Sequence, residues 1–423
     1  MAPKKVWIMN HYATNSYYNK AGRHYWFAKN LIEAGYDITI FCASTRHNSS
    51  DVLNTGNNKY MIKSTDGIPY VFVKSPIYNT NGLDRIKNMI AFYRNLFPVA
   101  KDYTQTNGKP DIILASSVHP LTLVAGIKLA KKFGIPIICE LRDLWPESIV
   151  AYSNLKRDSI LAKLLYQGEK WIYKKANKLI FTIEGGKDYI KDRKWDVENG
   201  GSIDISKVYH INNGVDLAEF DQNVQNHKLD DSDLEDDNSF KVIYTGSIRV
   251  ANNLGLVVDA AKYLDNLGEQ KNKRIKFIIF GDGEERETLQ KKCEELNLTN
   301  IVFKGKVSKK YVPYILSKSN LNILNYSNHD IWKYGGSQNK NFEYLASGRP
   351  ILSTITMGYD LIERYGAGVT LSEQTGKRIG EAILSVAELD KEQYDLMCSN
   401  ARNVATLYDY KVLSDKLITV FES

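Results

Sequence analysis

Short apolar runs alternate along this chain with segments in which apolar residues recur every three to four positions. Residues 6–9 (VWIM) and 38–42 have the pattern of buried strands. The segment between them has a helical pattern that ends at Gly35, a favourable helix C-cap. The order strand, helix, strand predicts a βαβ unit of a parallel sheet. The apolar helix positions are Phe27, Ala28, Leu31 and Ile32.

The same rhythm continues and then restarts, which predicts an α/β protein of two doubly wound, Rossmann-like domains. We expect an N-terminal domain over residues 1–215, an exposed acidic linker over 216–240 and a C-terminal domain over 241–404. A long helix is expected over residues 391–422, and its end, about 405–423, can pack back on the first domain. Further strands are expected at 70–73, 111–115, 135–139, 179–182, 208–211, 301–303 and 321–324, and in KVIYTGS and FIIFGDG, whereas residues 43–68 look like a polar loop.

Composition narrows the classes of function. The chain has 423 residues, 43% hydrophobic and 25% charged, with a net charge of +7. This positive bias suits anionic substrates or lipids but is too weak to indicate nucleic acid. Four scattered cysteines form neither a CxxC pair nor a metal spacing, so a reducing compartment and no metal site are expected. Neither a secretory signal nor an apolar run of about 18 residues is recognisable.

Two basic amphipathic segments, residues 83–101 and 156–178, allow two interpretations. Each combines an apolar stripe with several lysines or arginines. They are either helices packed on the core with a solvated basic face, or helices that touch anionic lipid.

The most informative stretch is residues 334–352, YGGSQNKNFEYLASGRPIL. A glycine-led helix start presents unpaired N–H groups and a positive dipole end, which together bind anions. Glu343, one turn further on, can accept hydrogen bonds from a ribose diol. The stretch therefore indicates a nucleotide-diphosphate site, and the alternative is a surface helix with a solvated Glu343.

Other glycine-bearing strand ends support such a site. Phosphates collect at the carboxyl edge of parallel sheets, where the loop at Gly22 is also expected to lie. A basic residue there can neutralise a diphosphate, and Arg249 is the candidate unless it is an ordinary surface arginine. The residues at these ends are Gly22, Gly246, Ser247, Gly281, Asp282 and Gly283.

Two strand ends in the first half carry candidate chemistry. His119 lies between a strand and a helix that begins near Pro120, where it is either structural or a ligand contact. The segment ELRDLWPES brings Glu140, Arg142 and Asp143 to the next strand end. These charges form either a site or a salt-bridge network around Arg142.

Taken in order, these features resemble the retaining family 4 glycosyltransferases, which have the GT-B fold of two Rossmann-like domains facing a central cleft. The segments NKAGRHYWFAKNL, ELRDLWPES and YGGSQNKNFEYLASGRPIL look like the bacterial branch that builds capsule, exopolysaccharide and O-antigen, including fucosaminyltransferase-like members. The resemblance implies an acceptor-binding first domain and a second domain that binds a nucleotide sugar.

In the second half, the resemblance assigns residues to the nucleotide sugar. Glu343 matches the second glutamate of the family's Glu-x7-Glu motif, and the first falls on Gly335, so that carboxylate is missing. Lys340 is expected to line the diphosphate and the sugar with Ser337 and Asn339. Arg249 resembles the family's diphosphate arginine. Since Asn252 and Asn253 stand where its lysine partner would be, Lys340 is expected to substitute.

In the first half, the resemblance implies that His119 lies near the donor sugar and that Gly22 approaches the donor phosphates. The implied reaction is metal-independent, retaining transfer of a sugar, expected to be N-acetylated and UDP-linked, to a lipid-linked saccharide at the cytoplasmic face of the membrane. The departing phosphate takes the acceptor proton, and Asp143 is the alternative base. A nucleotide-sugar 2-epimerase and a non-catalytic nucleotide-sugar-binding module remain alternatives.

Overall fold

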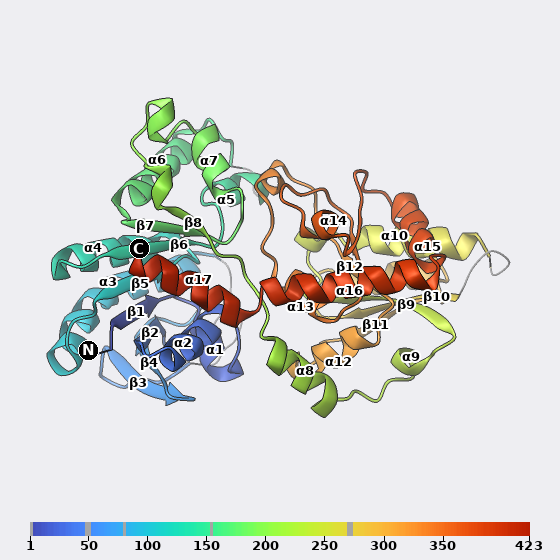
Figure 1. Cartoon of the computed structure of the whole chain (residues 1–423), viewed down its shortest axis with the longest axis horizontal. Helices are drawn as coiled ribbons and strands as arrows, with labels where there is room; N and C mark the ends of the chain where they lie inside the picture. Colours follow the sequence, from blue (N-terminus) through green and yellow to red (C-terminus); the bar gives the residue numbers. More distant parts are fainter. Residues whose placement is uncertain (1–2, 47–51, 79–81, 153–154, 269–273) are drawn as a thin grey trace. The chain divides into compact units, whose positions relative to one another are not determined.

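The computed structural model describes residues 3–46, 52–78, 82–152, 155–268 and 274–423. The chain divides into two compact units, Met1–Asn212 with Tyr410–Ser423, and Asn213–Asp409 (Figure 1). Each unit contains one largely parallel sheet with helices around it. This arrangement confirms the predicted fold class of two Rossmann-like α/β halves.

The first unit has an eight-stranded sheet in the order β3-β4-β2-β1-β5-β6-β7-β8. Every pairing is parallel except that of β3 with β4. The strands are β1 (Lys5–Met9), β2 (Asp37–Ala43), β3 (Tyr60–Thr65), β4 (Ile68–Val73), β5 (Ile112–Ser116), β6 (Ile137–Leu141), β7 (Lys178–Phe181) and β8 (Val208–His210). The helices are α1 (Thr14–Asn19), α2 (Arg23–Glu33), α3 (Leu83–Asn107), α4 (Pro120–Phe133), α5 (Glu147–Tyr152), α6 (Ile160–Lys175), α7 (Gly186–Asp192) and α17 (Tyr410–Glu422), with short 3-10 turns at Val197–Asn199 and Ile205–Lys207.

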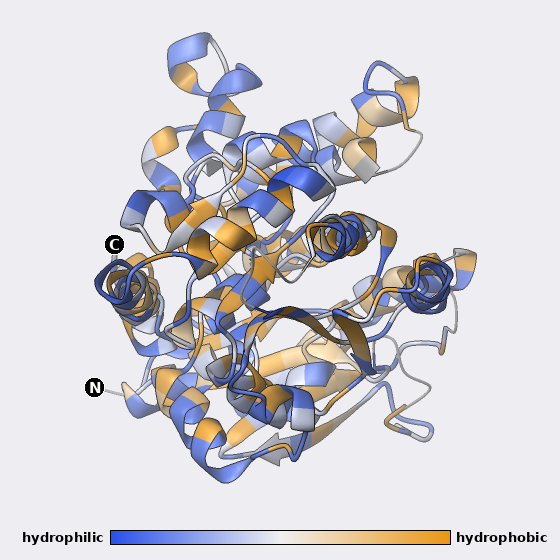
Figure 2. Ribbon diagram, turned by 90° about the vertical axis from the view of Figure 1, so that its right-hand side faces the viewer, coloured by the Kyte–Doolittle hydropathy of each residue, from blue (hydrophilic) through white to orange (hydrophobic). Residues whose placement is uncertain are grey.

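Aromatic packing fixes the centre of this first sheet. Trp7 in β1 is fully buried, and its ring lies 4.6 Å from that of Phe41, 5.6 Å from Tyr103 and 5.8 Å from Phe133. Figure 2 shows the general pattern, in which strands are mostly orange and helices alternate between orange and blue. The apolar runs therefore became the sheet and the periodic segments its covering helices, as the sequence predicts.

Two strands, β3 and β14 (Gly368–Thr370), were not expected. Residues 43–68 were interpreted as a polar loop, but Tyr60–Thr65 forms β3, antiparallel to β4 at the sheet edge. Its side chains are half-buried or exposed, since an edge strand is covered on fewer sides. The sequence YMIKST begins with Tyr, Met and Ile and ends with Lys, Ser and Thr, so it has neither a continuous apolar run nor a strict alternation that would predict a strand.

The second unit has a fully parallel six-stranded sheet in the order β11-β10-β9-β12-β13-β14. Val242, Phe277 and Ile323 are among the fully buried residues of its core. The strands are β9 (Ser239–Thr245), β10 (Arg274–Phe280), β11 (Ile301–Gly305), β12 (Leu321–Leu324), β13 (Ile351–Ser353) and β14 (Gly368–Thr370). The helices are α8 (Leu217–Asn226), α9 (Ser232–Glu235), α10 (Gly255–Asn266), α11 (Arg286–Glu295), α12 (Val312–Ser317), α13 (Asn339–Ala346), α14 (Leu361–Tyr365), α15 (Gly376–Ala387) and α16 (Lys391–Leu407), with 3-10 turns at Val250–Asn252, Lys309–Tyr311 and Asp330–Tyr334.

The acidic segment over residues 216–240 differs from the expected exposed linker, because it contains α8 and α9 and belongs to the second unit. Leu234 is completely buried. Lys304 lies 2.8 Å from Asp231 and 2.6 Å from Asp233, so the acidic side chains pair with lysines of the sheet. The sequence showed the acids but not these partners.

The expected long C-terminal helix is two helices, α16 and α17, separated at Tyr408 and Asp409. Asp409 accepts a hydrogen bond from Leu217 N at 3.2 Å, which ties the break to α8. Helix α17 belongs to the first unit, where it packs against α2 and Asn30 donates to Ser414 Oγ at 3.1 Å.

Candidate functional site

The glycine turns after β9 and β10 pack backbone against backbone. Gly246 N donates to Phe280 O at 3.0 Å, and Ile248 N donates to Asp282 O at 2.9 Å. A Cβ on Gly281 would lie 1.7 Å from Gly246 O, and one on Gly283 would lie 2.2 Å from Ile248 O. These glycines are therefore required for the turns to approach each other, a reason that the sequence alone did not reveal.

Ser247 and Arg249 lie exposed beyond the first of these turns. Ser247 Oγ donates to Asn252 Oδ1 at 3.1 Å, and buried Asn325 donates from Nδ2 to the carbonyls of Asn252 and Asn253 at 2.6 and 2.7 Å. The segment that carries Arg249 is thus held to the loop after β12. Within the described part of the chain, no acidic side chain pairs with Arg249.

The stretch that opens α13 is built as expected around glycine. Gly335 has a φ of +93°, which favours glycine, and Gln338 is the N-cap of the helix. Asn339 is exposed at the first helical position. Ser337 forms two hydrogen bonds with Asn213. Its Oγ accepts from Asn213 N at 2.9 Å, and its carbonyl accepts from Asn213 Nδ2 at 2.6 Å.

Lys340 brings α13 and the β9 turn together. Its Nζ lies so close to the turn that a Cβ on Gly246 would be 3.0 Å away. The ammonium donates to Tyr244 Oη at 2.8 Å and lies 4.8 Å from the Tyr326 ring centroid. Burial lowers the pKa of Lys340 to about 7, although Glu343 partly opposes this shift. Among the described residues, no carboxylate forms an ion pair with Lys340. A lysine in this position, beside a glycine turn and at the start of a helix, is suited to meet an anion.

Glu343 lies one turn beyond Lys340 on α13 and is only 20% exposed. Its Oε1 forms an ion pair with Lys309 Nζ at 3.1 Å. The sequence predicted Glu343 as a diol acceptor but gave no sign of this lysine. Its other carboxylate oxygen has no hydrogen bond to a described residue.

In the first unit, a buried polar network follows the carboxyl ends of β5 and β6. Glu140 is completely buried and accepts from Arg23 Nε at 2.8 Å and from Ser116 Oγ at 2.7 Å. His24 Nε2 lies 2.9 Å from Ser116 Oγ. Burial alone would raise the pKa of Glu140, but Arg23 and His24 hold it well below its usual range. The ion pair of this network joins Arg23 to Glu140, and among the described residues none involves Arg142.

The predicted site residues of this unit lie in different environments. Gly22 has a φ of +95° and is the N-cap of α2, where no neighbour would hinder a Cβ, so backbone conformation explains the glycine. Asp143 is exposed after β6. His119 caps α4 but is completely buried, with its Nε2 2.6 Å from His11 Nδ1.

The expected contact between His119 and a donor sugar stays a prediction, since the ring is buried in this structure but its Nδ1 has no hydrogen-bond partner among the described residues. His11, which sequence reasoning passed over, stacks on Phe92 with ring centroids 4.5 Å apart. Burial lowers the pKa of His119 to about 3, so the imidazole is neutral at pH 7. These contacts place His119 within the packing of the first unit.

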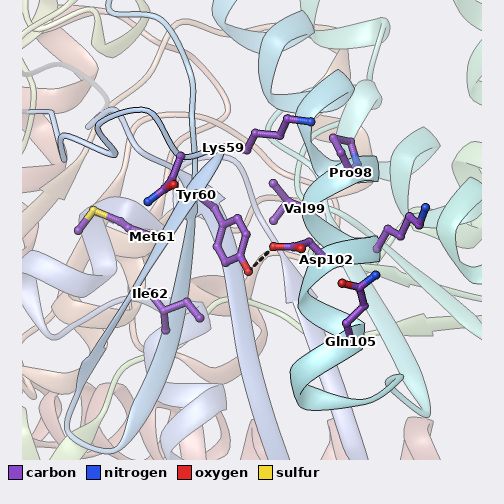
Figure 3. Close-up of a pocket in the computed structure, with 10 residues that line it drawn as sticks. Lys59, Tyr60, Met61, Ile62, Pro98, Val99, Asp102 and Gln105 are labelled. Carbon is purple, nitrogen blue, oxygen red and sulfur yellow. Dashed lines mark hydrogen bonds between the residues drawn. The ribbon is translucent and has the colours of Figure 1, made fainter.

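A hollow of about 770 Å³ lies elsewhere in the first unit, between β3 and α3 (Figure 3). Tyr60 donates to Asp102 Oδ2 at 2.8 Å across it. Its lining contains none of the predicted site residues. Among described residues, no cluster of three or more His, Cys, Asp or Glu side chains could hold a metal ion.

Two helices of the first unit expose apolar side chains. Ile160 and Leu164 on α6 are 80% and 65% exposed, Leu83 on α3 is 75% exposed, and Trp171 is partly exposed. No helix of the described ranges is long and apolar enough to cross a bilayer. The two basic segments therefore form helices that expose some apolar side chains to solvent and bury others against the core.

Two known protein families match most of the sequence. Residues 25–219 match the family described as Glycosyltransferase Family 4, and residues 225–404 match Glycosyl transferases group 1. No curated protein sequence matches the chain.

Several solved structures have the same fold. Sucrose-phosphate synthase from Thermosynechococcus elongatus is 14% identical with a TM-score of 0.70, over 99% of this chain and 98% of that one. Anabaena HepE in complex with UDP-glucose is 13% identical with a TM-score of 0.64, over 99% of both chains. WaaG, described as a glycosyltransferase involved in lipopolysaccharide biosynthesis, is 12% identical with a TM-score of 0.63, over 97% of this chain and 98% of that one.

Proposed function

Because this chain belongs to the family 4 glycosyltransferases of GT-B fold, which are retaining enzymes that use nucleotide sugars, we propose that it moves a sugar from a UDP-sugar to a lipid-linked saccharide. The product would be part of a bacterial surface polysaccharide such as capsule or O-antigen. The likeness of three segments to the fucosaminyltransferase-like branch favours an N-acetylated sugar. HepE with its bound UDP-glucose favours uridine as the base.

The observation that carries the proposal is the ammonium of Lys340 at the Gly246 turn. Lys340 belongs to the first turn of α13, whose N–H groups open the helix, and Glu343 follows one turn later. Together they offer a cation and backbone donors to a diphosphate and a carboxylate to a ribose. Arg249 adds a second cation on the neighbouring loop.

These residues support the following proposed mechanism. In the transition state the bond between the anomeric carbon and the phosphate oxygen breaks, and negative charge grows on the leaving diphosphate. Lys340, Arg249 and the α13 N–H groups stabilise that charge. The acceptor hydroxyl attacks from the same face and forms the new bond, and its proton passes to the leaving phosphate. Asp143 is the alternative acceptor of this proton.

The test is a transfer assay. A panel of UDP-sugars is incubated with the protein and a membrane extract, and the lipid-linked products are analysed by mass spectrometry. We expect the mass of one sugar to be added, with unchanged yield in excess EDTA, because protein cations neutralise the diphosphate. An epimeric nucleotide sugar formed without extract would indicate the 2-epimerase. Tight UDP binding without any product would indicate a binding module.

Replacing Glu343 with alanine is expected to weaken UDP binding roughly 10- to 100-fold, because the ribose loses a charged hydrogen-bond acceptor. Calorimetric titration measures this change. The matched control is Lys309→Met, which removes the ion-pair partner but keeps the carboxylate, and it should bind UDP at least as tightly as wild type. Wild-type affinity in Glu343→Ala would refute the assignment.

The lipid-linked acceptor implies contact with a membrane surface, and α6 is the proposed contact element. Its exposed Ile160, Leu164 and Trp171 stand among exposed lysines such as Lys163 and Lys174. Apolar side chains that enter the headgroup region and cations that meet anionic lipids act together at such interfaces. The protein would then work at the cytoplasmic face as a peripheral enzyme.

Flotation with anionic liposomes tests this contact. We expect wild type to float and the double variant Leu164→Ser/Trp171→Ser to partition at least about tenfold less, since two apolar side chains no longer leave water. Leu396→Ser, at an equally exposed leucine of the second unit, is the control and should float like wild type. Equal flotation of all three proteins would count against α6.

A further inference from the structure

Two tyrosines from separate elements converge on the ammonium of Lys340. Tyr244 belongs to β9, and the ammonium lies 4.3 Å from its ring centroid. Tyr326 follows β12, and its ring centroid is 4.8 Å from the same ammonium. Neither tyrosine was singled out by sequence reasoning.

Both rings are themselves held in place. The backbone carbonyl of Tyr326 accepts from Gln374 Nε2 at 2.6 Å, and its ring lies 5.6 Å from that of Trp332. The hydroxyl of Tyr244 donates its single proton to Ser247 O at 2.7 Å, so its oxygen must face Lys340 as an acceptor. A continuous chain of hydrogen bonds thus runs from Lys340 through Tyr244 to the β9 turn.

An anion site requires that the neighbours of Lys340 do not neutralise its charge. A carboxylate beside Lys340 would cancel the charge that must act on a diphosphate. Aromatic faces attract a cation through their quadrupole, which carries no net charge, so the two rings hold the protonated ammonium without neutralising it. Among described residues, Lys340 has no carboxylate within ion-pair distance, and Glu343, the acid nearest along α13, pairs with Lys309.

From this geometry, we propose that Tyr244 and Tyr326 are positioning residues that clamp Lys340 against the Gly246 turn and keep it charged for the leaving diphosphate. The proposal rests on the proposed function of the same site. Tyr244 sets the direction of the ammonium, and Tyr326 supplies the second aromatic face.

The clamp has a consequence for pH dependence. The groups that face the ammonium are Tyr244 from β9, Tyr326 from the loop after β12 and Glu343 from its own helix. Burial holds the pKa of Lys340 near 7, so the contribution of Lys340 to UDP affinity should be constant below that pH and fall above it. Removing an aromatic face lowers this pKa further, and the fall must then begin at a lower pH.

The test compares Tyr326→Phe, which keeps the face, with Tyr326→Leu, which removes it. UDP affinity is measured by calorimetry from pH 6 to pH 9. We expect Tyr326→Phe to follow wild type, and Tyr326→Leu to bind about fivefold more weakly near pH 8 while matching wild type near pH 6. Identical pH profiles for the two variants would overturn the role of the ring.

Tyr244→Phe tests the hydrogen-bonded side of the clamp. It is expected to lower kcat about tenfold with a smaller change in KM, because the loss concerns the direction of the ammonium in the transition state. A kcat equal to that of wild type would overturn this part.

Tyr365→Leu, at an exposed tyrosine of α14, is the control for general damage to the unit. If wild type bound no UDP, the proposed function itself would fail, whereas UDP binding without these differences would reject only the clamp.

Discussion

Replacement of Lys340 by methionine is expected to lower kcat/KM for sugar transfer by about 100- to 1000-fold, the usual effect of removing one preorganised donor from a developing negative charge. The effect is large because the ammonium lies at the turn and, among the described residues, no carboxylate lies within ion-pair distance of it. Initial rates of UDP release at several UDP-sugar concentrations provide the measurement.

Two controls separate this effect from damage to the fold. Lys262→Met changes an exposed lysine on α10 of the same unit and should leave kcat/KM unchanged. Lys340→Met itself should be no less thermally stable than wild type at pH 7 to 9. The reason is that burial disfavours the charged form, so the unfolded chain holds this proton more tightly than the folded one. Wild-type turnover in the folded variant would remove Lys340 from the mechanism.

The second large effect concerns stability. Arg23→Met is expected to lower the free energy of unfolding by about 3–5 kcal/mol, because it leaves the carboxylate of Glu140 buried without its cation. Arg23 also donates to the carbonyls of Ile211 and Asn212 at 2.9 and 2.5 Å, which hold the end of the first unit. Thermal unfolding followed by circular dichroism should show a fall in Tm of roughly 10 °C.

The chain offers a matched comparison for this ion pair. Lys20 and Asp66 also form an ion pair, at 3.1 Å, but both side chains are solvent-exposed. Lys20→Met should therefore cost at most about 1 kcal/mol. The double variant Arg23→Met/Glu140→Met should recover much of the lost stability, since no buried charge is left unpaired. A double variant as unstable as the single one would contradict the explanation.

The fold was largely predictable from the sequence because both sheets are mostly parallel and buried. Their strands are continuous apolar runs, such as residues 6–9, and the helices between them have clear periodicity. The elements that were not predicted have neither a continuous apolar run nor a clear helical periodicity. Edge strand β3 has neither a continuous apolar run nor a strict alternation. Asp231 and Asp233, at the start of α9, pair with Lys304, which lies far away in sequence.

The candidate site was predictable where backbone chemistry defines it. The glycines after β9 and the helix start before Lys340 have local sequence signatures. Tyr244 and Tyr326 do not, because 82 positions separate them and only the sheet order β9-β12 brings them to one ammonium. For His119, the sequence predicted the position between a strand and a helix correctly. It could not predict the burial against His11, because that contact depends on tertiary packing.

The most direct measurement of the central claim is a calorimetric comparison of UDP and UMP binding to wild type and Lys340→Met at pH 7. If Lys340 and the start of α13 hold the second phosphate, wild type should bind UDP at least about tenfold more tightly than UMP, and the variant should lose most of that difference. Equal affinities for UDP and UMP in wild type, or a preference for UDP that persists in Lys340→Met, would contradict the account.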